Sequence, residues 1–194
     1  MPSDAVRVAL QIYAEPPAAR GAAQAPLPHG VLDALKLAAG SAKTQGACSR
    51  DFGVAPERLT AAAKFFIEQV MFTQGADHYR VLGVDPQAST AMIHEHYRWL
   101  IRWLHPDREG AGWHAVLAGR VNKAYAELRH AGRRAAYDEV RQTQAAASAA
   151  QPHPCLPARR DAALVNRARR RRRMRRLAWL AALVIAVFLV LGTP

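Results

Sequence analysis

Residues 77–140 of this 194-residue chain read DHYRVLGVDPQASTAMIHEHYRWLIRWLHPDREGAGWHAVLAGRVNKAYAELRHAGRRAAYDEV. In the first half of this stretch, apolar residues recur at positions i, i+4, i+7 and i+11, which places them on one face of an α-helix: Ile93, Tyr97, Leu100 and Leu104. We expect Ser89 or Thr90 to cap its N-terminus. The helix is expected to stop at His105, because Pro106 disfavours helical geometry in the residue before it.

A second long helix is predicted from about Trp113 to His130, after a glycine-containing loop. Its inner face carries Leu117, Val121, Ala124, Tyr125 and Leu128. Two helices with matching apolar faces pack as an antiparallel hairpin, and the loop between them then lies in solvent. Short helices are expected on either side of the hairpin, at Tyr79–Val84 and at Arg133–Val140.

The same stretch contains a series of landmarks in order: Tyr79-Arg80-Val81-Leu82-Gly83-Val84, Tyr97, Leu100, His105-Pro106-Asp107-Arg108, Asn122, Ala124-Tyr125, Leu128, Arg134 and Tyr137-Asp138. With these residues, Asp77–Val140 resembles a J domain, over about a third of the chain. The resemblance implies that the His105-Pro106-Asp107 loop docks at the nucleotide-binding domain and interdomain linker of a DnaK-type chaperone. It implies that docking stimulates the ATPase of that partner, and that this protein is not itself an enzyme.

The tripeptide is suited to binding. Pro106 fixes one backbone angle, so the loop loses less entropy when it docks. The Asp107 carboxylate can accept charge-assisted hydrogen bonds from an arginine of the partner, and His105 can cap the preceding helix. The alternative is that the tripeptide is only a tight turn, because proline and aspartate are common turn residues.

Basic residues flank this loop. Arg98 and Arg102 are four residues apart on one helix face, and Arg108 follows the loop. We expect these three arginines to steer the encounter with an acidic chaperone surface. An ordinary solvated face is the alternative. The sequence departs from the family pattern at Trp103, where a basic residue is usual, and Glu95 reduces the positive charge of the same helix.

A second stripe on the first hairpin helix consists of Met92, His96, Trp99 and Trp103. Residues 56–76 are predicted to form an amphipathic helix, regular over about 57–72, that packs on the J domain and covers this stripe with Phe65 and Phe66. The alternative is that the aromatic residues complete the core of the hairpin.

Residues 1–55 are predicted to be mostly irregular. Val6, Val8, Leu10 and Ile12 alternate with small or polar residues, which fits either a strand or a frayed helix start. Four prolines between positions 16 and 28 indicate a linker. Val31–Ala39 is compatible with a short helix ended by Gly40, and Ser41–Gly53 is interpreted as a loop.

The formal net charge of +12 is concentrated near the C-terminus, where residues 159–176 contain ten arginines and one acid. Residues 141–176 are predicted to be a flexible linker that ends in this arginine-rich segment. Residues 177–194 follow as a predicted transmembrane tail anchor, since Leu177–Leu191 is uninterrupted in apolar residues. As a helix these 18 residues span about 27 Å, close to a hydrocarbon core of about 30 Å.

The arginines would remain on the cytoplasmic side and bind anionic lipid headgroups: Arg169, Arg170, Arg171, Arg172, Arg173, Arg175 and Arg176. Such a chain is expected at a membrane, a bacterial inner membrane if its arginine- and alanine-rich composition reflects a GC-rich bacterial genome, with its N-terminal bulk in the cytoplasm. Nucleic-acid binding is the rival use of an arginine run and is a minor interpretation here.

The sequence predicts an all-α fold: a J-domain hairpin with short flanking helices, an N-terminal helical extension and a single C-terminal transmembrane helix. Its two cysteines, Cys48 and Cys155, form no Cys-x-x-Cys pair, and the histidines have no matched ligand spacing, so no metal or other cofactor is expected. The expected partners are a DnaK-type chaperone, membrane lipid and a client protein that the sequence does not identify. The competing function is a membrane-anchored scaffold that reuses the J fold without stimulating a chaperone.

Overall fold

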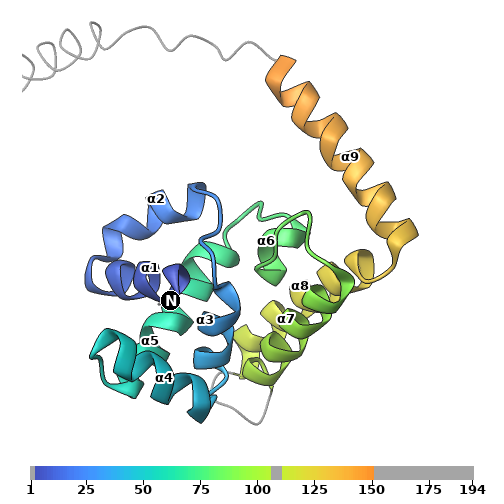
Figure 1. Ribbon diagram of the computed structural model, residues 1–194. Helices are drawn as coiled ribbons and strands as arrows, with labels where there is room; N and C mark the ends of the chain where they lie inside the picture. Colours follow the sequence, from blue (N-terminus) through green and yellow to red (C-terminus); the bar gives the residue numbers. More distant parts are fainter. Residues whose placement is uncertain (1–2, 106–110, 151–194) are drawn as a thin grey trace, which may run out of the picture. The chain divides into compact units, whose positions relative to one another are not determined.

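The computed structural model describes residues 3–105 and 111–150, and every regular element in these residues is helical (Figure 1). In chain order the elements are α1 (Asp4–Ala14), the 3₁₀ turn η1 (Pro16–Ala18), α2 (Ala19–Gln24), α3 (Val31–Ala38), α4 (Ala42–Phe52), α5 (Pro56–Phe66), the π-helical turn η2 (Ile67–Met71), α6 (His78–Leu82), α7 (Thr90–Trp103), α8 (Ala111–Leu128) and α9 (Ala131–Ala150). The predicted all-α fold class is confirmed for this part of the chain.

By its internal contacts the chain divides into residues 1–143 and residues 144–194. Of the second unit, the structure describes only the helical residues 144–150. The predicted arginine segment and membrane helix lie outside the described residues. Among the helices that the structure does describe, none combines the length and the hydropathy that a membrane crossing requires.

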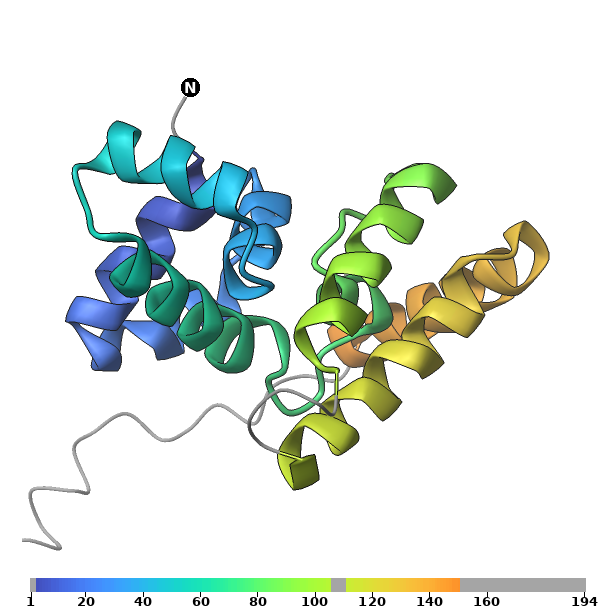
Figure 2. The same ribbon diagram turned by 90° about the horizontal axis from the view of Figure 1, so that it is seen from below.

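The predicted hairpin is formed by α7 and α8, which lie side by side (Figure 2). Its core consists of the buried residues Ile93, Leu100, Leu104, Leu117, Val121, Ala124 and Leu128. The Ser89 hydroxyl accepts a hydrogen bond from the backbone N–H of Met92 at 3.2 Å, as an N-cap does. Helix α7 ends at Trp103, two residues before His105, so the predicted start and end of this helix agree with the structure.

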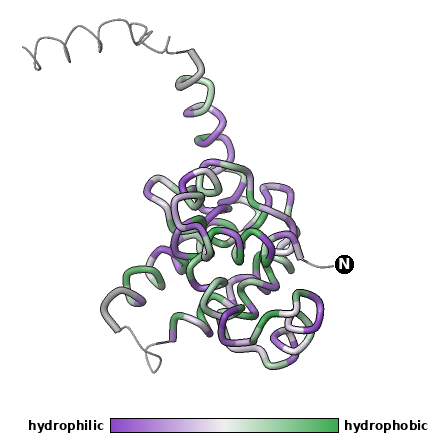
Figure 3. Tube along the Cα trace, turned by 90° about the vertical axis from the view of Figure 1, so that its left-hand side faces the viewer, coloured by the Kyte–Doolittle hydropathy of each residue, from purple (hydrophilic) through white to green (hydrophobic). Residues whose placement is uncertain are grey.

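Residues 4–71, from α1 to η2, are here called the N-terminal extension. The prediction that residues 1–55 are mostly irregular is wrong for the described residues, because most of them are helical. In α1 the buried residues are Ala5, Val6, Ala9 and Ile12, a helical spacing in which alanines fill two of the four places. The alternation of larger residues hid this period. Figure 3 shows hydrophobic and hydrophilic positions interleaved along the helical part of the chain.

Helix α4 also lies where a loop was predicted. The Ser41 hydroxyl accepts a hydrogen bond from the backbone N–H of Thr44, and Gly53 ends the helix with a φ of +64°. The helix has few large apolar residues, so its sequence gives a weak periodic signal. It is held by contacts with α5, including a 3.0 Å hydrogen bond from the Gln45 amide to the Thr60 hydroxyl.

The last helix is longer than predicted. A helix over Arg133–Val140 was expected, but α9 continues to Ala150, into the segment interpreted as a flexible linker. Residues 145–147 and 149–150 are alanines. Alanine has the highest intrinsic helix propensity, so a helix can continue there without large apolar side chains to bury.

Among the helices of the N-terminal extension, the one that packs along α7 is α3 and not the predicted helix at 57–72. Phe66 is buried and Phe65 meets Tyr13 edge-on, so both phenylalanines belong to the core of the extension. The end of η2 does reach the stripe, because the rings of Phe72 and Trp103 lie 6.4 Å apart. Trp103 also lies 5.6 Å from the His114 ring on α8. The two predicted alternatives are therefore each partly correct.

Candidate functional site

Three of the six residues predicted to bind a chaperone lie together on the C-terminal half of α7 and directly after it. Arg98 and Arg102 are exposed on this helix, and His105 is exposed one residue after the buried Leu104. The other three are Pro106, Asp107 and Arg108, which lie outside the described residues. The structure therefore presents to solvent each described residue of the predicted site.

Arg102 has an aromatic neighbour. Its guanidinium carbon lies 5.6 Å from the ring centre of Trp99, one turn earlier on α7. A cation over a tryptophan ring is attracted by the negative face of the ring, which restricts the positions of the Arg102 side chain. Trp103, the residue that departs from the family pattern, is only 2% exposed. It therefore adds apolar packing beneath the site and does not occupy the exposed basic face.

The outer face of the hairpin is held by aromatic stacking. The rings of Tyr97 on α7 and Tyr125 on α8 are nearly parallel, with centres 3.9 Å apart. The Tyr97 hydroxyl donates to the side-chain oxygen of Asn122 at 3.1 Å, and the Tyr125 hydroxyl lies 2.8 Å from Nδ1 of His94. Two of the family landmarks, Tyr97 and Asn122, thus fix α7 against α8 and position the helix that leads to the loop.

A second set of landmarks joins α6 to the start of α9. The Tyr79 hydroxyl accepts a hydrogen bond from Nε of Arg134 and donates to the Asp138 carboxylate, both at 2.9 Å. The Tyr137 hydroxyl accepts from the backbone N–H of His78 at 3.0 Å. Burial raises the pKa of both tyrosines, so their hydroxyls stay protonated at neutral pH. These bonds fix both ends of the domain around the hairpin.

Two arginines bind α6 and α8 to the N-terminal extension and to the two residues that follow it. Arg80 of α6 donates to the backbone oxygens of Val70 at 2.9 Å and Ala25 at 3.0 Å. Arg120 of α8 donates to the backbone oxygens of Phe72 at 2.8 Å and Thr73 at 3.0 Å. Val70 lies in the last turn of η2 and Ala25 is the C-cap of α2. Carbonyl groups at a helix end lack partners within their own helix, so the Arg80 guanidinium group satisfies these two. No sequence pattern had indicated either contact.

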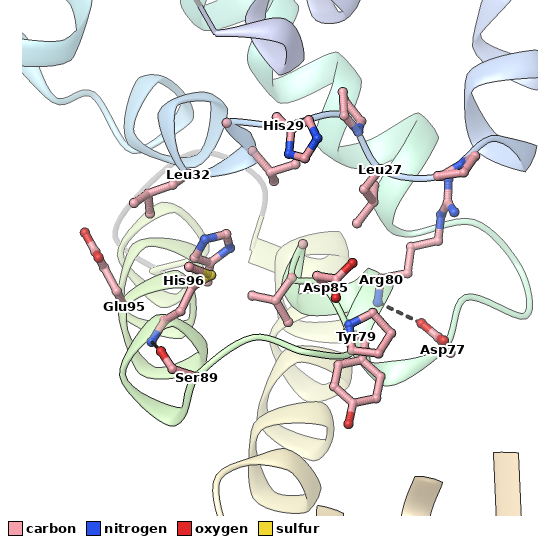
Figure 4. Close-up of a pocket in the computed structure, with 18 of the residues that line it drawn as sticks. Leu27, His29, Leu32, Asp77, Tyr79, Arg80, Asp85, Ser89, Glu95 and His96 are labelled. Carbon is pink, nitrogen blue, oxygen red and sulfur yellow. Dashed lines mark hydrogen bonds between the residues drawn. The ribbon is translucent and has the colours of Figure 1, made fainter. Parts of the chain in front are cut away.

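An open groove of about 770 Å³ lies between residues 26–32 and helices α6 and α7 (Figure 4). Leu27, His29 and Leu32 line it on the side of the extension. Ser89, the N-cap of α7, and Glu95 and His96 on that helix line it on the other side. Sequence reasoning had not found this groove, because its two sides come from distant parts of the chain. In the described part of the chain, no group of three or more His, Cys, Asp or Glu residues is placed to hold a metal ion.

Comparison with known proteins agrees with this geometry. A family model described as the DnaJ domain matches residues 77–138. DnaJ-like protein MG200 of Mycoplasma genitalium is 36% identical over 69 residues, which are 36% of this chain and 12% of that protein. Chaperone protein DnaJ of Xanthobacter autotrophicus is 41% identical over 63 residues, which are 32% of this chain and 17% of that protein. No solved structure matches the chain.

The match to the family model covers the segment in which the tyrosine, arginine and aspartate contacts described above hold α6, α7, α8 and the start of α9 together. The matched segment spans less than a fifth of either relative, and residues 1–76 lie outside the match to the family model. Residues 77–138 of the chain are therefore similar to the DnaJ domain, and the segment has the helices and contacts that its sequence predicts for a J domain.

Proposed function

We propose that this protein is a co-chaperone whose His105-Pro106-Asp107 loop docks on a DnaK-type chaperone and stimulates its ATPase. The observation that carries the proposal is the position of His105, which is exposed directly after α7 of a J domain, on the helix that also exposes Arg98 and Arg102. One of the similar proteins is named as a chaperone protein, which supports the same class of function.

In this mechanism the protein binds and orients but breaks no bond, so we propose that it is not an enzyme. The fixed backbone angle of Pro106 reduces the entropy lost on docking, and the Asp107 carboxylate accepts hydrogen bonds from a cation of the chaperone. The arginines raise the rate of encounter with an acidic surface. ATP is hydrolysed in the active site of the partner.

The test is the ATPase rate of a DnaK-type chaperone with increasing amounts of the full-length chain. We expect His105→Gln and Asp107→Asn to abolish stimulation. His130→Gln is the matched control, because His130 is also exposed but lies at the other end of α8, and it should stimulate like the wild type. If the wild type and His105→Gln give the same rate, the protein is instead a scaffold that reuses the J domain.

We further propose that the chain tethers this activity to a membrane, and that the tether is a bacterial inner membrane anchor. The support comes from the sequence, in which the uninterrupted apolar run Leu177–Leu191 follows Arg169–Arg173, Arg175 and Arg176. An apolar helix favours the hydrocarbon core, and arginines favour anionic headgroups on the cytoplasmic side. The chaperone would then be recruited to clients at the membrane surface.

Flotation with lipid vesicles tests the tether. The full-length chain should float with anionic vesicles, and a chain ending at Arg176 should lose most of this binding. Replacing Arg169–Arg173 by glutamine should reduce flotation with anionic vesicles more than with neutral ones. If the full-length chain stays unbound to both kinds of vesicle, the tether is wrong, whereas the ATPase result is unaffected.

A further inference from the structure

Lys36 of α3, in the N-terminal extension, contacts α7, the helix that leads to the His105 loop. Nζ of Lys36 lies 3.3 Å from the Glu95 carboxylate and 5.9 Å from the ring centre of Trp99. The Lys36 and Glu95 side chains are 24% and 46% exposed, so the pair faces solvent in part. A residue from outside the J domain thus contacts the same helix as Arg98 and Arg102.

Trp99 connects this pair to the site. The Lys36 ammonium group and the Arg102 guanidinium carbon both lie near the Trp99 ring, at 5.9 Å and 5.6 Å from its centre. Lys36, Trp99 and Arg102 therefore form a continuous patch that begins on α3 and ends one residue before the C-terminus of α7. Glu95 is the carboxylate beside this patch.

The charge balance of α7 gives the contact a role. Helix α7 contains two guanidinium groups and one carboxylate, that of Glu95. An unpaired carboxylate there would repel an acidic partner and offset one of the two arginines. Lys36 places a third positive charge against Glu95, so the face that reaches the loop stays basic. Charges within a Debye length of about 8 Å act together on an approaching partner.

We propose that Lys36 is part of the chaperone-docking surface: α3 supplies the charge that neutralises Glu95 and keeps the exposed face of α7 basic toward an acidic surface of the DnaK-type chaperone. This inference rests on the proposed function and adds to it a contribution from the N-terminal extension. The competing explanation is that Lys36 and Glu95 only tether α3 to α7. Partly exposed ion pairs contribute little to stability, which favours a role in the surface potential.

Two substitutions, Lys36→Gln and Glu95→Gln, distinguish the two explanations. If Lys36 is part of the docking surface, they change chaperone affinity in opposite directions, whereas a mere tether predicts changes in the same direction. Both break the same ion pair, but the first makes the surface less basic and the second makes it more basic. In the chaperone ATPase assay with the full-length chain at low salt, Lys36→Gln should raise the half-saturating concentration about two- to fourfold. Glu95→Gln should lower it by a similar factor, and both effects should fade at about 1 M salt.

Lys64→Gln is the control, because Lys64 is exposed on α5, a helix that packs against α1, α3 and α4. It should leave the half-saturating concentration unchanged, and thermal unfolding should show that all three variants fold. If Lys36→Gln and Glu95→Gln shift the concentration in the same direction, or neither shifts it while His105→Gln abolishes stimulation, the role of Lys36 is wrong and the proposed function stands. If the wild type does not stimulate the chaperone, both are wrong.

Discussion

His96 is the one polar residue among those buried most deeply in the described part of the chain, with 5% of its surface exposed. Its Nδ1 lies 3.0 Å from the backbone oxygen of Leu82. Because a carbonyl oxygen only accepts, Nδ1 carries the proton of this bond. Desolvation lowers the pKa of His96, although the bond to Leu82 and the charge of Glu95 act in the opposite direction and Lys36 lowers it further.

This lowered pKa makes stability depend on pH. As the pH falls below the ordinary histidine pKa of about 6.5, His96 takes up a proton in the unfolded chain but stays neutral in the folded chain until its lower pKa is reached. The free energy of unfolding should therefore be fully retained above about pH 6.5 and should decrease as the pH falls from there toward the lower folded pKa. Urea unfolding followed by circular dichroism between pH 7.5 and pH 5, values we choose to bracket the ordinary histidine pKa, measures this decrease.

The matched variant is His96→Asn, whose amide can donate to Leu82 from nearly the same position but does not titrate. His78 also has a lowered pKa because of burial, and its contribution stays in both proteins. We expect the variant to show a smaller loss of stability on acidification. Equal losses in the two proteins would show that His96 is not the residue responsible.

At the scale of elements, the turn after α6 fits closely against the extension. Gly83 has a φ of +69°, in the left-handed region that favours glycine. A Cβ atom at this position would lie 2.7 Å from Cγ1 of Val31 on α3 and 2.8 Å from Cε of Met71 in η2. The glycine thus serves both as the C-cap of α6 and as a point of close approach between the J domain and the elements α3 and η2.

Two glycine substitutions separate these roles. Gly53→Ala introduces a Cβ at a similar φ of +64° with no atom within 4 Å, so it should cost only the backbone strain, about 1–2 kcal/mol. Gly83→Ala adds a clash and should cost about 1–3 kcal/mol more. Urea unfolding measures both. Val31→Ala should be less destabilising in the Gly83→Ala background than in the wild type, and additive effects would contradict this contact.

Element by element, the periodic signal decided which helices could be predicted. Helices α7 and α8 carry large apolar residues at helical spacing, and both were predicted to within about two residues at the ends described. Two of the four residues that α1 buries are alanines, and the residue that α4 buries is Cys48, so the period of each helix was too weak to distinguish from a strand or a loop. The cap residues Ser41 and Gly53 were the available signal for α4.

At the scale of the first unit, the extension and the J domain share one core. Phe72, directly after the extension, packs against Trp103, and α3 packs along α7. Arg80 and Arg120 donate hydrogen bonds to backbone oxygens of residues between 22 and 73. Tyr79, Leu82 and Trp103 belong to the same buried cluster as Leu35 and Met71. The extension therefore contributes to the stability of the J domain.

Removal of the extension tests this dependence. A chain that begins at Gly75 should be less stable than the full-length chain by at least about 2 kcal/mol, the cost of exposing one large apolar side chain. Denaturant unfolding measures the difference, and a hydrophobic dye should bind more strongly to the shortened chain. A chain that ends at Ala150 is the control, since residues 144–194 form a separate unit by their contacts. Full stability of the chain beginning at Gly75 would contradict a shared core.

The sequence by itself determined the hairpin, its caps and the position of His105 at the end of α7, because these depend on local spacing and on the backbone limits set by Pro106. It also determined the similarity of residues 77–138 to the DnaJ domain, because the landmark residues occur in order along one segment. Only the tertiary structure decided that α3 lies along α7, that Lys36 meets Glu95, and that Arg80 and Arg120 bind the extension. Apart from the bond between Arg80 and Val70, these hydrogen bonds join residues at least 47 positions apart in the sequence. They depend on how helices with weak periodicity pack against one another, and no local sequence pattern specifies that packing.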